Sequence, residues 1–452
     1  MQPYKPLAVS SHNLTSEIPL NQKLALSLVA SGMLLQLIFW ISYSSSNASV
    51  WLWSSLAAIS IGSVWFTYEK YSETLPGIKN NHVWHASLTS RGIWAWILGV
   101  FLTGFYVILY WYPYLLGLAA EGSENTGLVA LFDPFSQLLK GKPASQWFVY
   151  GAIYTFTILL LGIKFIYKYR HNRYQVYRTI SIIFFQTAIA FILPEIMQSL
   201  NQPYYDFKNI WPLNYYFFFD WNLDAMMAAG TFGYFMLFWG IISFLVITPV
   251  MTYFFGKRWY CSWVCGCGGL AETAGDSFRQ LSDKSLKAWK IERWMIHSVL
   301  VFVTLMTIAV LVTRFTGFSN LLIIDSYTLS SVYGFLIGAA FSGVVGVGFY
   351  PLLGNRVWCR FGCPMAAYLG IIQRMKLKFT VNKKEHIIKS KFRITTNGGQ
   401  CISCGNCSTY CEMGIDVKAY AQRQEDIVRA SCVGCGICSA VCPRGVLRLE
   451  NE

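Results

Sequence analysis

The chain has 452 residues, of which 54% are apolar and only 13% are charged, whereas an average soluble domain has about 25% charged residues. This composition excludes an ordinary soluble protein and predicts a membrane protein. The formal charge of +14 does not indicate nucleic acid as a partner, because the Lys and Arg residues are spread over short loops between apolar segments.

Residues 1–22 are polar and without periodicity, so we expect a short N-terminal tail. Eight apolar segments follow, and each is close to the ~20 residues that a helix needs to cross a bilayer. The first is longer than the apolar part of a signal peptide, and the second comes only a few residues later, which favours an uncleaved helical hairpin. The segments are 23–43, 49–67, 92–115, 147–167, 179–199, 231–255, 295–316 and 329–353.

The loops predict the orientation in the membrane. Lys and Arg gather in every second loop, and the loops between these contain few. By the positive-inside rule, the basic loops and both termini lie in the cytoplasm, so we expect a multi-pass protein of the cell inner (cytoplasmic) membrane. The basic loops are 68–91, 168–178 and 257–294, and the alternate loops hold only Lys140, Lys142 and Lys208.

Two of the outward loops, 117–146 and 201–230, are long and rich in aromatic residues. Such residues are typical of the membrane interface, where their rings lie at the level of the lipid head groups. A second interpretation is a pocket for the aromatic head group of a quinone near the outer leaflet. In that case Glu195, Asp220 or Asp224 would take protons there.

Two short stretches resemble each other, and each follows an apolar segment. The first is Gly256-Lys-Arg258-Trp-Tyr-Cys261-Ser-Trp-Val-Cys265, and the second is Gly354-Asn-Arg356-Val-Trp-Cys359-Arg-Phe-Gly-Cys363-Pro364. On a helical turn, a spacing of four residues places both sulfurs on one face. Two such turns brought together would offer four thiolates to one metal centre, from Cys261, Cys265, Cys359 and Cys363.

The chemistry of these membrane cysteines stays open at this point. Three arginines beside them, Arg258, Arg356 and Arg360, would favour the thiolate form. Soft thiolates suit Cu(I), Zn and Fe–S clusters alike, and without a metal they would act as a redox pair of thiols. Cys267 lies outside the repeat and is either a spare ligand or a bystander.

Eight further cysteines follow the doubled spacing of bacterial ferredoxins with two [4Fe–4S] clusters. Three thiolates spaced three residues apart lie on a tight loop around three corners of a cluster, and the fourth binds the other cluster. We therefore expect two crossed ligand sets, with a pair of zinc sites as the weaker alternative. The first set is Cys401, Cys404, Cys407 and Cys442, and the second is Cys432, Cys435, Cys438 and Cys411.

One residue departs from the ferredoxin pattern. Cys442 is followed by Pro443, as the pattern requires, but Cys411 is followed by Glu412. The difference removes no ligand, and we expect it to alter the local solvent access or the potential of a cluster.

These features predict an all-α polytopic membrane protein with about eight transmembrane helices and a small α+β ferredoxin-like domain at the C-terminus. The basic linker before that domain is expected to rest on anionic lipid head groups. The expected divisions are a tail at 1–22, a six-helix membrane region at 23–255, a membrane region with both Cys-x3-Cys motifs and two further helices at 256–375, the linker at 376–400 and the ferredoxin-like domain at 401–452.

The motifs from Arg258 to Cys265, from Arg356 to Pro364 and from Cys401 to Pro443 resemble those of the membrane-bound polyferredoxins. This family is related to the nitrous oxide respiration regulator NosR, the quinol dehydrogenase NapH and the oxidase assembly protein CcoG. In the family each paired motif ends in Cys-Pro, whereas here Cys265 is followed by Gly266. The resemblance implies electron transfer in the membrane, commonly between quinol and a respiratory reductase or its maturation system, and its CcoG branch adds copper reduction.

Two functions follow from these motifs. The first is an electron-transfer subunit of a quinol-linked oxidoreductase, which passes electrons between the quinone pool or a membrane redox partner and cytoplasmic [4Fe–4S] clusters. The second is a copper-reducing or metal-handling assembly factor for a respiratory oxidase or reductase, which the lack of Met- or His-rich tracts disfavours. The expected partners are membrane lipid, a quinone, and membrane or cytoplasmic electron-transfer proteins.

Overall fold

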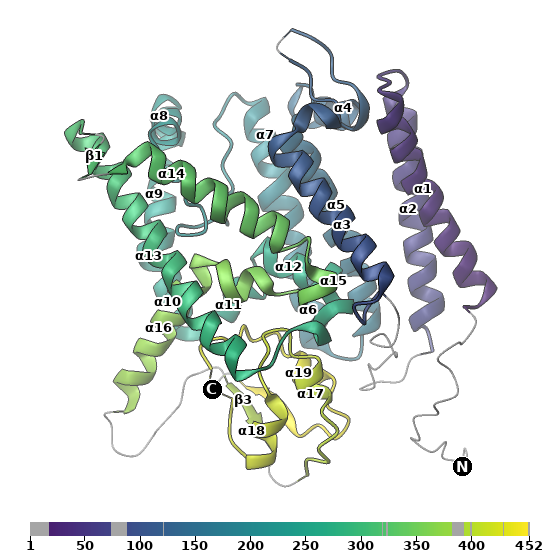
Figure 1. The fold of residues 1–452 in the computed structure, drawn as a ribbon, viewed down its shortest axis with the longest axis vertical. Helices are drawn as coiled ribbons and strands as arrows, with labels where there is room; N and C mark the ends of the chain where they lie inside the picture. Colours follow the sequence, from purple (N-terminus) through teal and green to yellow (C-terminus); the bar gives the residue numbers. More distant parts are fainter. Residues whose placement is uncertain are drawn as a thin grey trace.

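The computed structural model describes residues 18–73, 88–120, 122–318, 320–321, 324–381, 393–397, 400–427 and 429–450. The expected eight spans are confirmed, because eight helical segments in these ranges are long and apolar enough to cross a membrane. The protein is therefore a multi-pass membrane protein (Figure 1). The segments are Leu20–Ser42 (α1), Ala48–Tyr71 (α2), Ile93–Trp111 (α3), Gln146–Lys168 (α5), Arg173–Ser199 (α6, η4 and α7), Thr231–Phe255 (α9, η5 and α10), Leu286–Thr316 (α13) and Ser326–Val345 (α14 and η7).

Three of the spans contain a π-helical stretch. Two of these stretches end just before Pro194 and Pro249, each at the start of the following α-helix. Because proline has no N–H and its ring clashes with the preceding turn, a wider turn lets the helix continue across the membrane. The parts are α6 (Arg173–Phe184), η4 (Phe185–Ile192) and α7 (Leu193–Ser199); α9 (Thr231–Ile242), η5 (Ser243–Ile247) and α10 (Thr248–Phe255); and α14 (Ser326–Tyr333) and η7 (Gly334–Val345).

The two long aromatic loops contain helices among their described residues. A 3₁₀ turn, η3 (Pro113–Leu116), precedes the first loop, which forms helix α4 (Gly127–Lys140), and the apolar face of α4 packs into a buried cluster with Phe39 and Leu109. The second ends in helix α8 (Asp220–Ala228), but its first half turns inward, so that Ile210 lies in the same buried cluster as the membrane cysteines. The aromatic side chains of these loops therefore serve largely to pack the membrane region.

Short elements form the surface that faces the C-terminal domain. They lie after the sixth span and after the eighth, and a short β-ribbon joins the seventh span to the eighth. Helix α13 begins at Leu286, earlier than the expected start of the seventh span at residue 295, and its added turns carry Glu292. The elements on this surface are α11 (Arg258–Cys261), α12 (Gly266–Thr273), η6 (Ala274–Leu281), α15 (Tyr350–Leu353), η8 (Trp358–Gly362) and α16 (Pro364–Val381). The ribbon consists of β1 (Asn320–Leu321) and β2 (Ile324–Asp325) and lies at the opposite end of the molecule from the C-terminal domain in Figure 1.

The C-terminal domain is drawn in yellow below the helices in Figure 1. Strands β3 (Arg393–Thr396) and β4 (Leu447–Glu450) pair antiparallel and bring its two ends together, with Ile394 opposite Leu449. Between them lie three short helices: α17 (Asn406–Thr409), α18 (Val417–Arg423) and α19 (Ile437–Ala440). Helix α16 continues into the expected linker, 376–400, and β3 also lies within these bounds, where it pairs with β4 of the C-terminal domain. Residues 382–392 and 398–399 of the linker lie outside the described residues.

Helices α1 and α2 form the expected hairpin and pack through glycines. A Cβ atom on Gly32 would lie 2.7 Å from Ser55 O, and one on Gly62 would lie 2.7 Å from Ala25 O. Small residues at such crossings let helix backbones approach closely within a membrane.

We predict that Gly62→Val separates this hairpin, because the added side chain would strike the backbone of α1. Overpacking of this kind costs about 1–3 kcal/mol. The thermal midpoint of the detergent-solubilised protein should fall relative to wild type. Gly104→Val in α3 is the matched control, because nothing lies within 4 Å of a Cβ atom at Gly104, and equal midpoints for the two variants would contradict the prediction.

Candidate functional site

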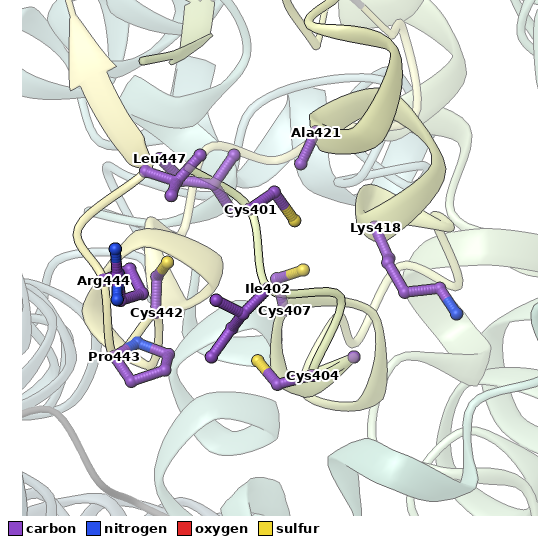
Figure 2. A pocket seen from close by; sticks show the side chains of 12 residues that line it. Cys401, Ile402, Cys404, Cys407, Lys418, Ala421, Cys442, Pro443, Arg444 and Leu447 are labelled. Carbon is purple, nitrogen blue, oxygen red and sulfur yellow. The ribbon is translucent and has the colours of Figure 1, made fainter. Parts of the chain in front are cut away.

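The first expected cysteine set surrounds one hollow in the C-terminal domain. Cys401, Cys404, Cys407 and Cys442 line a pocket of about 20 Å³, and Figure 2 shows Cys442 across from Cys401 and Cys407. Gly405 has a φ of +78° and ends the loop just before helix α17, a conformation that side-chain-bearing residues rarely adopt. The structure therefore brings this set together.

The second expected set also gathers in one place. Burial raises the pKa of Cys438 well above its usual range, and the neighbouring thiols of Cys435, Cys411 and Cys432 raise it further. Gly436, with a φ of +71°, has the same role before helix α19 as Gly405 has before α17. The two halves of the domain thus repeat one loop-and-turn unit.

The residues of both sets fit [4Fe–4S] clusters. Each set offers four thiol groups, and in such a cluster each thiolate binds a different iron atom. Four sulfurs around a cluster lie farther apart than those around one zinc ion. Among the described residues, no three His, Cys, Asp or Glu side chains are arranged to hold a single metal ion.

The two membrane Cys-x3-Cys motifs have equivalent backbones. The N–H of Cys265 donates to Tyr260 O at 2.8 Å, and the N–H of Cys363 donates to Trp358 O at 2.9 Å. Only the first cysteine of each motif lies on the expected helical turn, because Cys265 and Cys363 are extended and directly precede α12 and α16. N–H groups in the first turns of α12 and α16 donate to their sulfurs, and this favours the thiolate.

The structure brings these membrane cysteines together. Burial raises the pKa of Cys363 well above its usual range, and the thiols of Cys359, Cys265 and Cys261 raise it further. Cys267 hydrogen-bonds to Cys265 and so belongs to the same site. The donors again fit an Fe–S cluster, with Cys267 as a fifth thiol beside the four expected ligands.

Lys208 is a neighbour of this site that sequence reasoning missed. The inward half of loop 201–219 places its Nζ 3.1 Å from the position that a Cβ atom on Gly266 would take, and Gln186 Oε1 would be 2.5 Å from that atom. A proline after Cys265 would therefore require the Gln186 side chain to shift and would lie in tight contact with Lys208. The glycine of the first motif leaves room for both side chains.

Of the three arginines expected to favour the thiolates, one contacts a sulfur. Arg356 Nη1 lies 3.6 Å from Cys359 Sγ. Arg360 instead donates to Glu292 Oε2 at 3.1 Å, and Arg258 hydrogen-bonds to Tyr174.

The second cysteine set docks directly on the membrane region. Three side chains donate hydrogen bonds to consecutive carbonyls of its first loop. These are Ser262 to Val433 O, Tyr174 to Gly434 O and Gln175 to Cys435 O, each at 2.8 Å. Because Ser262 lies between Cys261 and Cys265, the loop that would hold the second cluster lies against the membrane cysteines.

A buried ionic network lies at the same junction. We use this name for Lys168, Arg178, Glu272, Asp276, Arg279, Arg356 and Glu412, whose side chains are at most 5% exposed. Lys168 pairs with Asp276 at 2.7 Å, Asp276 with Arg279 at 2.8 Å, Arg279 with Glu412 at 2.5 Å, Glu412 with Arg356 at 2.8 Å, Arg356 with Glu272 at 2.6 Å, and Glu272 with Arg178.

A cavity of about 60 Å³ that contains several polar groups borders the membrane cysteines. It has room for about four water molecules, at roughly 10–15 Å³ each. Asn355 lines it, is 1% exposed, and has a side-chain oxygen without a hydrogen-bond partner among the described residues. Its lining also includes Tyr110, Tyr150, Tyr154, Tyr350, Cys267 and Cys359.

The three acidic residues expected to serve an outer quinone pocket are all paired. Glu195 lies 3.1 Å from Lys140, and both side chains are buried. Arg314 holds Asp220 at 2.8 Å and Asp224 at 2.7 Å near the surface. These contacts account for the three carboxylates as structural ion pairs.

Comparisons with known proteins match both cysteine-bearing regions. A family model described as a 4Fe-4S binding domain matches residues 236–285 and again 335–384, once over each membrane motif. A model described as a 4Fe-4S dicluster domain matches residues 400–447. The cysteine patterns and the helices together define an iron–sulfur electron-transfer protein with membrane spans.

One curated relative is the electron transport protein YccM of Escherichia coli K12. It is 24% identical over 200 residues, which are 40% of this chain and 47% of YccM. The chain thus spans about half the length of this curated relative. No solved structure matches the chain significantly.

We predict that Tyr174→Phe loosens the docked loop, because the change removes one hydrogen bond to Gly434 O. Such a bond contributes about 0.5–1.5 kcal/mol. Amide hydrogen exchange in 433–436 should become several times faster. Tyr177→Phe on the same helix is the control, because Tyr177 is 62% exposed, and equal exchange in both variants would show that the Tyr174 hydroxyl does not hold the loop.

Proposed function

We propose that the chain is the electron-transfer subunit of a quinol-linked membrane oxidoreductase. Its twelve ligand cysteines would hold three [4Fe–4S] clusters, one at Cys261, Cys265, Cys359 and Cys363 and two in the C-terminal domain. The observation that carries this proposal is that cysteines of all three sets lie in or against one buried cluster. Electrons can then move singly from one centre to the next, with potentials tuned by burial and by hydrogen bonds to sulfur.

The order of the centres follows from their surroundings. The second set lies against the membrane cysteines through the Val433–Cys435 loop. The first set lies nearer the surface, where Cys404 is exposed and Ile402 beside it is 58% exposed. We therefore propose that a cytoplasmic or membrane-associated redox protein contacts the chain at Ile402 and Cys404.

A quinol is the proposed partner on the membrane side. The resemblance to the NosR, NapH and CcoG group supports this choice. So does the similarity to YccM, which is named an electron transport protein. The cavity beside Cys359 and Cys267 is too small for a quinone ring, but its tyrosine hydroxyls, together with water that enters it, would relay the protons that quinol oxidation releases towards the solvent. With both termini in the cytoplasm, as the basic loops predict, the C-terminal clusters face the cytoplasm.

Metal analysis of anaerobically purified protein tests the number of centres. We expect about twelve iron atoms per chain, and about eight after Cys261→Ser with Cys359→Ser, because each cluster holds four. Cys267→Ser should keep about twelve, since four other thiols complete the membrane set. Copper in proportion to protein, lost in the double variant, would favour a metal-handling factor instead.

Reduction by a quinol analogue tests the membrane partner. We expect the analogue to bleach the visible absorption of the clusters in the wild type. The Cys261→Ser, Cys359→Ser variant should no longer respond to the quinol, although dithionite should still reduce its C-terminal clusters. Unchanged reduction by quinol in this variant would show that electrons enter elsewhere.

A further inference from the structure

Glu412 occupies the position where the ferredoxin pattern has a proline after the fourth cysteine. Its side chain is completely buried. Burial alone would raise its pKa, but the guanidinium groups of Arg279, Arg356 and Arg178 lower the pKa to about 2. A proline there could make none of these contacts, so the residue has a role outside the ferredoxin loop itself.

The partners of Glu412 all belong to the membrane region. Its Oε2 lies 2.5 Å from Arg279 Nη1 and accepts a hydrogen bond from Asn355 Nδ2 at 3.2 Å. Its Oε1 lies 2.8 Å from Arg356 Nη2. Because Glu412 directly follows Cys411, these contacts fix the position of one expected ligand of the second set.

Arg356 connects this carboxylate to the membrane cysteines. One of its terminal nitrogens lies 3.6 Å from Cys359 Sγ, and the other pairs with both Glu412 and Glu272. A planar guanidinium can make such contacts in several directions at once, which an ammonium group cannot do with fixed geometry. One side chain therefore bridges the surroundings of two cysteine sets.

The charges of the buried ionic network favour anionic centres on either side. Its four cations, Lys168, Arg178, Arg279 and Arg356, exceed its three anions, Glu272, Asp276 and Glu412, by one. A positive charge that water does not screen stabilises an added electron on a nearby thiolate-bound centre.

We propose that Arg356 and Glu412 form an electrostatic bridge that holds the second cysteine set against the membrane cysteines and sets the potentials of both centres. Both are positioning residues, because neither binds iron. The inference rests on the proposed function, since it needs a centre at the membrane cysteines for its full effect.

Two charge-neutralising variants of the full chain test the bridge, with midpoint potentials measured by EPR titration. Arg356→Gln removes a positive charge, so the potentials of both adjacent centres should become more negative. Glu412→Gln removes a negative charge, so these potentials should become more positive. Loss of packing alone would not produce shifts of opposite sign.

Asp276→Asn is the matched control. It removes a buried charge from the same network, but its ion-pair partners are Lys168 and Arg279, and neither of these two residues is next to an expected ligand cysteine. Its shift in midpoint potential should be smaller than those of Arg356→Gln and Glu412→Gln. A shift as large as that of Glu412→Gln, or shifts of equal sign in the two bridge variants, would overturn the proposal.

Docking is tested separately with Glu412→Pro, which restores the ferredoxin pattern. Both C-terminal clusters should remain, as shown by iron content, while amide exchange in 433–436 should become at least about tenfold faster, the equivalent of losing one strong polar contact. If the amides of 433–436 in this variant exchange as slowly as in the wild type, Glu412 does not hold the domain.

If Arg356→Gln does not fold, Arg356→Lys replaces it. This variant should keep the midpoint potentials near those of the wild type and still speed the amide exchange of 433–436. Unchanged exchange would count against the bridge.

Failure of the proposed function would look different. If the protein holds only about eight iron atoms, the membrane centre is absent and the electron path through it fails. The exchange of 433–436 and the potential of the second C-terminal cluster would still report on Glu412. Unchanged values of both in Glu412→Gln and Glu412→Pro would reject the bridge independently.

Discussion

The ion pairs between Glu412 and the arginines 279 and 356 are the interaction on which the arrangement of the redox sites depends. Removing these charges from water is costly, and well-packed apolar residues could match the net stability of a buried ion pair. What apolar residues could not supply is a single relative position of the two surfaces. The carboxylate has its partners in one arrangement only, because a displacement would leave the buried Glu412 carboxylate without a counter-ion and would take one counter-charge from each of its two arginines. The junction thus favours specificity over stability.

The hydrogen bonds around the docked loop reinforce this position. Ser262, Tyr174 and Gln175 bind three successive carbonyls of the second cysteine set, so its loop is held by the membrane region as well as by its own domain. The probability of electron tunnelling falls steeply with distance. Rigid contact between the two cysteine sets would therefore suit the proposed electron transfer, and the three hydrogen bonds to this loop supply such contact.

Much of this architecture could be predicted from the sequence because its signals are local. The eight apolar segments are confirmed as spans, since span length depends only on bilayer thickness. The ferredoxin-type region is matched by a dicluster model, because cluster ligands are set by spacing along one loop. Neither signal requires knowledge of which distant residues meet.

The remainder depends on contacts between distant segments. Loop 201–230 is expected at the outer surface because it holds few basic residues, yet its residues Ile210 and Lys208 reach the membrane cysteines. Lys168, Arg178 and Arg279 contribute to the positive-inside signal of their loops, but the fold buries all three. Hydropathy and charge counts cannot distinguish a basic residue that faces water from one that pairs within the protein.

Two residues that depart from the motif patterns lie at contacts between distant segments. Gly266 stands where the pattern has a proline and leaves room for Gln186 and Lys208, and Glu412 stands where the pattern has a proline and pairs with two arginines of the membrane region. Each is a residue that its own loop does not need. In a chain whose ligands are all explained by local spacing, such mismatches point to the surfaces that bring the separate cysteine sets together.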